Sequence, residues 1–100
     1  MKGKAKKYLC RWEDKRGKMH SAVFAAEGIR RTLLDAQTKK RMPDMAVYAL
    51  DDNPSAAPTP VRLFYDHVFS RVQIFDLRGH IIDSAGMPIR GQIYWEAVTV

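Results

Sequence analysis

The chain has 100 residues, of which 46% are hydrophobic and 28% are charged, close to the usage of ordinary globular proteins. This composition excludes a fibrous or wholly disordered chain, and the length predicts one domain with one hydrophobic core. The formal net charge of +6 favours an anionic partner but carries no information about the fold.

The positive charge is concentrated at the start of the chain. The first eighteen residues contain eight Lys and Arg against two acids, which gives +6. Residues 19–50 carry +2 and residues 51–100 carry −2. We therefore expect a basic front half, in which residues 1–5 form a flexible basic arm, and a slightly acidic back half.

The front half predicts a β-hairpin. Residues 6–12 alternate, with Tyr8, Cys10 and Trp12 on one face, and residues 19–24 alternate again after a polar, glycine-containing segment. A turn in that segment places Lys15, Arg16 and Lys18 at an exposed tip.

Between about residues 25 and 41 the apolar spacing becomes helical. One stripe predicts the buried face: Ala26, Ile29, Leu33 and Ala36. The opposite face carries charges of alternating sign at four-residue spacing: Glu27, Arg31, Asp35 and Lys39. We expect the basic residues 39–41 to complement the helix dipole and Pro43 to end the helix. A start just after Ser21 remains an alternative, although Gly28 lowers the helix propensity.

The back half reads as β-structure. Residues 45–50 and 61–66 have strand length, the latter with helix as an open alternative, and residues 51–60 predict an exposed loop with three prolines. Residues 68–77 predict a strand, 76–80 a turn and 81–82 its return, after which residues 83–88 break the chain. Residues 92–100 predict a closing strand.

These elements together predict an α+β fold. We expect a mostly antiparallel sheet of about five to seven strands, with the N-terminal hairpin first, a β-rich C-terminal half and a single layer of one amphipathic helix on the sheet. If the closing strand lies at a sheet edge, its few charges favour pairing into a homodimer.

No residue pattern predicts catalysis, a cofactor or a metal. Cys10 shares a face with two aromatic residues, which favours a buried small hydrophobe over a nucleophile. The nearby His80, Asp83 and Ser84 do not make a triad by adjacency, and the three histidines are widely spaced. We therefore expect a protein that is not an enzyme.

The lone cysteine also bears on location. A single Cys cannot form an intramolecular disulfide, and the basic start lacks the apolar run of about 7–15 residues that a signal peptide requires. The longest apolar runs fall far short of the ~20 residues needed to span a bilayer. We expect a cytoplasmic protein with no membrane partner.

The basic front half is the feature that suggests a function. We expect a non-enzymatic binding or regulatory protein whose hairpin and arm dock on a nucleic acid or an acidic nucleoprotein surface. The shared face of Tyr8 and Trp12 favours core packing over base stacking. Arg31 and Lys39 have acidic partners nearby on the predicted helix and are weaker candidates for contact with an anionic partner, whereas Arg30 remains a candidate. The candidate contacts to an anionic partner are Lys6, Lys7, Arg11, Lys15, Arg16, Lys18, Arg30, Lys40 and Arg41.

Two other interpretations remain open. The first is a protein–protein inhibitor or adaptor of the kind encoded by phages and mobile elements, which blocks a host machine sterically and needs an exposed apolar or mixed patch. The second is a small-molecule pocket lined by aromatic residues, although a chain of this size needs such residues in its core. The aromatic residues in question are Trp12, Phe24, Tyr94 and Trp95.

Overall fold

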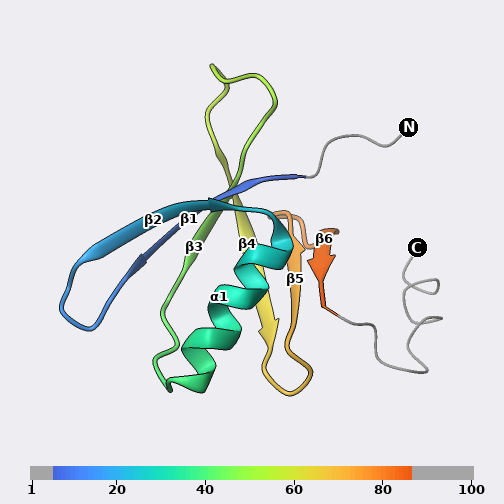
Figure 1. Ribbon diagram of the computed structural model, residues 1–100. Coiled ribbons are helices and arrows are strands. Elements are labelled where there is room, and N and C mark those ends of the chain that lie inside the picture. The colour runs from blue at the N-terminus through green and yellow to red at the C-terminus, as the bar shows by residue number, and fades with distance from the viewer. Residues whose placement is uncertain (1–5, 87–100) are drawn as a thin grey trace, which may run out of the picture.

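The computed structural model describes residues 6–86, which form one helix and a six-stranded antiparallel sheet in the order β2-β1-β3-β4-β5-β6 (Figure 1). The α+β class and the hairpin-first layout are as the sequence predicts. The basic arm at residues 1–5 and the closing strand at 92–100 lie outside the described residues. The elements are β1 (Tyr8–Glu13), β2 (Met19–Phe24), α1 (Ala26–Thr38), β3 (Ala46–Ala49), β4 (Thr59–Asp66), β5 (Arg71–Phe75) and β6 (Ile81–Ala85).

Helix α1 packs on one face of the sheet, where it contacts β2, β5 and β6 (Figure 1). Three of the four residues in the predicted apolar stripe are buried there, namely Ala26, Ile29 and Leu33. The sheet contributes alternate residues to the same core, as the period of two requires. They are Tyr8, Cys10, Val47, Val72 and Ile74.

The β1–β2 hairpin extends past the rest of the sheet. All six residues of β1 pair with β2, but only Tyr8 to Arg11 also pair with β3. The outer end of the hairpin, from Trp12 to His20, therefore has no neighbouring strand on the β3 side among the described residues. Figure 1 shows it projecting to the left of the sheet and helix.

Two hairpins are closed by the same five-residue turn. Residues 14–18 read Asp-Lys-Arg-Gly-Lys and residues 76–80 read Asp-Leu-Arg-Gly-His. In each turn the glycine N–H donates to the carbonyl of the aspartate at 3.0 Å, and the glycine has a positive φ of 83° or 92°. This geometry is a type I turn with a bulge, in which glycine avoids the strain of the left-handed region. Both turns share the sequence pattern Asp-x-Arg-Gly.

The sheet coils, so that β6, the last strand in the order, comes back toward the start of β1. The buried hydroxyl of Tyr8 donates to Oδ2 of Asp83 at 2.8 Å, and Nζ of Lys6 donates to the carbonyl of Ile82 at 3.0 Å. These contacts join residues 75 and 76 positions apart. They fix the curvature of the sheet around the helix.

Helix α1 ends at Thr38, before the predicted end near residue 41. Lys40 adopts a φ of 56°, and its N–H donates to the carbonyl of Gln37 at 3.0 Å. The N–H of Arg41 reaches the carbonyl of Ala36 at 2.8 Å. This pair of bonds is a Schellman motif, so backbone hydrogen bonding ends the helix before Pro43. The start at Ala26 excludes the alternative near Ser21, which lies in β2.

Three predicted boundaries in the back half were wrong. Residues 67–70 form a turn, so β5 begins at Arg71 and not at residue 68. Strand β6 continues to Ala85, through residues expected to break the chain. Residues 51–60 are exposed as predicted, but the last two belong to β4. Residues 61–66, for which the sequence leaves strand and helix open, are part of strand β4.

Within residues 6–86, no helix combines the length and the hydrophobicity that crossing a bilayer would require.

Candidate functional site

The β1–β2 hairpin, with the residue that precedes it, carries the densest group of exposed cations among the described residues. We call these five residues the basic hairpin: Lys7, Arg11, Lys15, Arg16 and Lys18. Each is exposed, and no carboxylate in the described part of the chain forms an ion pair with any of them. Lys15, Arg16 and Lys18 lie on the projecting tip, whereas Lys7 and Arg11 lie farther back, beside β3.

Asp14, the acid nearest the tip, has both carboxylate oxygens engaged inside the turn. Its Oδ1 accepts hydrogen bonds from the N–H groups of Arg16 at 2.8 Å and Lys18 at 2.9 Å. Its Oδ2 lies 2.9 Å from Nε2 of His20. The contact with His20, followed by the backbone donors, lowers the pKa of Asp14. The carboxylate therefore orders the backbone of the tip, and neither Asp14 nor the exposed Glu13 forms an ion pair with the cations of the basic hairpin.

An aromatic row supports the inner face of the hairpin. The ring of Trp12 stacks on His20, with centroids 5.5 Å apart, and on Phe24 at 6.5 Å. Trp12 also packs against the hydrophobic core, and Tyr8 is completely buried. Tyr8 therefore lies in the core and the half-buried Trp12 packs against it, as their shared face favours.

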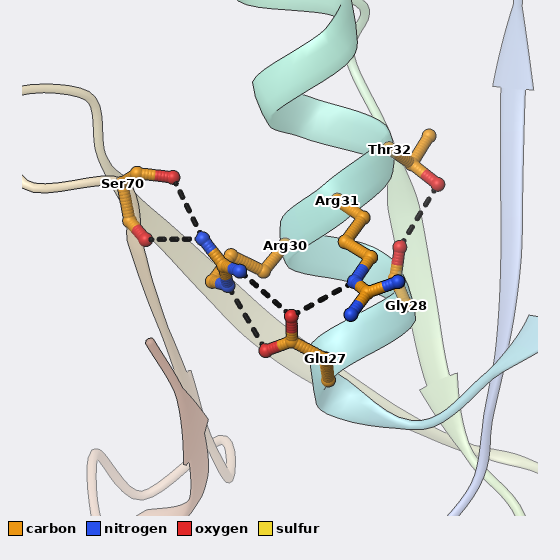
Figure 2. Close-up of polar contacts among 6 residues, drawn as sticks. All are labelled: Glu27, Gly28, Arg30, Arg31, Thr32 and Ser70. Atoms are coloured by element: carbon orange, nitrogen blue, oxygen red, sulfur yellow. Dashed lines mark hydrogen bonds and ion pairs between the residues drawn. The ribbon is translucent and has the colours of Figure 1, made fainter. Parts of the chain in front are cut away.

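Two of the predicted contacts serve the fold. Lys6 donates to β6, as described above. Arg30 was expected to lack an acidic partner, and this expectation was wrong. Its guanidinium donates to Glu27 at 2.7 and 2.9 Å and to the carbonyl and hydroxyl of Ser70 at 3.3 and 3.1 Å (Figure 2). On a helix, a side chain can pair with the residue three positions later as well as with the residue four positions later. Glu27 does both, since it accepts from Arg30 and from Arg31.

Lys40 and Arg41 follow the end of α1 and are exposed. They belong to a different element from the basic hairpin, and nothing in their backbone contacts joins the two groups. They form a second, smaller basic surface.

Cys10 and the residues near His80 do not assemble a reactive group. Burial raises the pKa of the Cys10 thiol to about 11. Asp83 accepts from Tyr8, whereas Nδ1 of His80 lies 3.5 Å from Asp76. In residues 6–86, no three His, Cys, Asp or Glu side chains come together in a way that could hold a metal ion.

The turn at residues 67–70 exposes two apolar side chains for which the sequence predicts a strand. Val68 is 69% exposed and Phe69 is 52% exposed. Asp66 Oδ1 accepts from the N–H groups of both residues, at 3.1 and 3.4 Å, which holds them in a turn. The signal in the sequence is Asp66, two residues before the apolar pair.

Helix α1 anchors this turn at both ends. Arg30 holds Ser70, which has a φ of 53°, and Nε2 of Gln37 donates to the carbonyl of His67 at 3.1 Å. Leu34 lies between Arg30 and Gln37 on the same helix stripe and is 37% exposed. We call Leu34, Val68 and Phe69 the apolar turn patch.

Comparison with known proteins does not extend this description, because no family model, no curated protein and no solved structure matches the chain.

Proposed function

We propose that the protein is a non-enzymatic binding module that docks on nucleic acid through the basic hairpin. The observation that carries the proposal is the projecting hairpin whose exposed cations have no paired carboxylate within the described residues. Lys and Arg side chains in this state bind phosphates and release condensed counterions, which supplies most sequence-independent affinity for nucleic acids.

The shape of the hairpin supports the same proposal. A two-stranded ribbon fits the major groove of a duplex, and the part beyond Trp12 extends clear of β3. The second Asp-x-Arg-Gly turn, at residues 76–80, has the same backbone but only Arg78 as a fixed cation. The charge of the first turn is therefore a property of that hairpin and not a requirement of the turn itself.

The test is a binding titration with a fluorescein-labelled duplex and a labelled single strand at several salt concentrations. The hairpin variant replaces Arg11, Lys15, Arg16 and Lys18 by Ala. We expect it to bind far more weakly, with a salt slope reduced by about 3–4, because each lost phosphate contact removes roughly one unit.

A matched variant controls for net charge. It also removes four cations, all away from the hairpin: Arg31, Lys39, Arg62 and Arg78 to Ala. We expect this variant to keep the wild-type slope. Equal affinity of the hairpin variant and the wild-type protein would overturn the proposal, and an equal loss in both variants would reduce it to nonspecific attraction by net charge.

The apolar turn patch favours protein docking as a second candidate function. Val68 and Phe69 are displayed on an anchored turn, a rigid presentation that lowers the entropic cost of binding. Cations follow at the end of α1, so an apolar surface with an acidic rim fits best. If this candidate is correct, Phe69→Asp abolishes copurification of a nuclease-resistant protein partner that the hairpin variant still retains.

A further inference from the structure

The two edges of the described sheet differ in how they are protected. Strand β6 has a register irregularity opposite Ile74 and Phe75, and the carbonyl of Ile82 accepts from Lys6. Strand β2 forms the other edge and contains no Lys, Arg, Asp, Glu or Pro in its six residues. Bulges, charges and prolines are the usual devices that prevent edge strands from pairing, and β2 has none of them.

The hydrogen bonds around β1 fix which backbone groups of β2 point outward. The N–H of Asp14 donates to the carbonyl of Lys18, whereas the N–H of Leu50 donates to the carbonyl of Lys7. Because directions alternate along an antiparallel pair, even-numbered residues of β1 bond to β2 and odd-numbered residues bond to β3.

The register then shows which residues of β2 direct their backbone groups toward β1. Tyr8, Cys10 and Trp12 lie opposite Phe24, Ala22 and His20, so these three residues of β2 direct their backbone groups toward β1. The N–H and C=O groups of the other three residues point away from the sheet. These residues are Met19, Ser21 and Val23, all exposed.

We propose that this outer edge of β2 pairs antiparallel with β2 of a second copy of the chain, about a two-fold axis at Ser21. The outward groups repeat symmetrically on both sides of Ser21, so each copy donates and accepts at the same three positions. Met19 then lies opposite the partner's Val23. These side chains are 55% and 53% exposed, and their pairing buries apolar surface on one face of the joined sheet.

The dimer would set the distance between the two hairpin tips. Ser21 lies about five residues from the middle of the tip, which at ~3.4 Å per residue is about 17 Å. Antiparallel pairing sends the tips in opposite directions, so they lie about 34 Å apart, close to one turn of duplex DNA. This spacing argument rests on the proposed function, whereas the dimer itself does not.

The register is tested by disulfide trapping in the full chain. Under mild oxidation, Ser21→Cys should form a covalent dimer more than about tenfold faster than Met19→Cys, because Cα atoms of a hydrogen-bonded pair are ~5.5 Å apart, within disulfide range. The two copies of position 19 would lie four residues apart, about 13 Å, and cannot be bridged. Wild type is the second control, since Cys10 is buried. Equal rates for the two variants would overturn the proposed pairing.

Sedimentation equilibrium tests the dimer without cysteine chemistry. The edge pairing covers less area than a standard interface of ~1,600 Å², so we expect wild type to dissociate on dilution. Ser21→Pro should be monomeric throughout, because its lost N–H faces away from β1 and the hairpin keeps its bonds. Ser21→Thr should dimerise like wild type, and an unchanged circular dichroism spectrum and melting temperature show that Ser21→Pro is folded.

A wild-type chain that stays monomeric at high concentration, or a Ser21→Pro variant that still dimerises, would refute the proposal. The nucleic-acid titration is scored separately on the wild-type protein. A monomer that binds nucleic acid leaves the proposed function in place and removes the dimer. A dimer that does not bind leaves the dimer in place and removes the spacing argument.

Discussion

Gly28 shows how one residue can oppose its own element for the sake of a tertiary contact. Glycine in a helix costs about 1 kcal/mol relative to alanine, and the sequence alone marks it as a weakness. A Cβ at this position would lie 2.9 Å from Cδ1 of Phe24 and 3.1 Å from its Cβ. Phe24 stacks on Trp12, so the missing side chain lets α1 approach the aromatic row of the hairpin.

Gly28→Ala should therefore destabilise the protein, although alanine favours the helix. We expect a net loss of about 1 kcal/mol, since overpacking costs about 1–3 kcal/mol and helix propensity returns about 1 kcal/mol. Urea denaturation measures the change. In a Phe24→Ala background the same substitution should be neutral or stabilising, and a stabilising effect in the wild-type background would contradict the packing argument.

At the scale of the element, Glu27 organises the start of α1. The N-cap residue, Ala25, offers no side-chain cap, and Glu27 places negative charge in the first turn. Hydrogen bonds from Arg30, then from Arg31, lower the pKa of Glu27 from 4.5 to about 2. Through Arg30 the same carboxylate connects to Ser70 and so to the turn before β5 (Figure 2).

The lowered pKa gives the stability of this element a definite dependence on pH. The contribution of ionised Glu27 is present above pH 4.5 and is lost as the pH falls toward 2, because protonation then removes the charge. Glu27→Gln should cost roughly 1 kcal/mol at pH 7, a value reduced from the full shift because the side chain is 45% exposed and screened. At pH 2 the variant and wild type should unfold at nearly the same urea concentration. A difference that persists at pH 2 would assign the effect to packing.

At the scale of the whole molecule, the contact between Tyr8 and Asp83 joins strands at distant positions in the sheet order. Tyr8 is completely buried, and burial followed by the contact with Asp83 raises the pKa of its hydroxyl. The phenol therefore stays a hydrogen-bond donor at all physiological pH values. It donates to Oδ2 of Asp83, while Oδ1 of the same carboxylate accepts from the N–H of Ser84 at 2.9 Å.

Tyr8→Phe should destabilise the fold by about 1–2 kcal/mol, since the ring still fills the core and only the hydrogen bond is lost. Tyr48→Phe is the matched control, because the described residues give its hydroxyl no hydrogen-bond partner. Thermal unfolding of both variants measures the difference. Equal melting temperatures would show that the Tyr8 hydroxyl contributes no net stability.

Much of the fold was predictable because its signals are local. The alternation in residues 6–12 and 19–24 and the apolar stripe of α1 each follow from one side being buried. Two of the errors fell where local hydrogen bonds to the backbone took precedence over the side-chain pattern. Val68 and Phe69 have strand propensity, but Asp66 captures their N–H groups, and Lys40 adopts a left-handed conformation that the sequence does not mark.

For the candidate site, composition and local patterns predict that the charge lies at the start of the chain and that a turn presents part of it. Which of these cations bind groups within the protein depends on tertiary contacts. Lys6 and Arg30 bind groups 76 and 40 residues away, which no local pattern reveals. Strand order likewise places β2 at an edge of the described sheet, and the strand pairing makes the hairpin extend past β3. The number and sequence positions of the charges follow from the sequence. Whether a charged side chain is free to bind a partner depends on long-range contacts that form when the sheet coils around the helix.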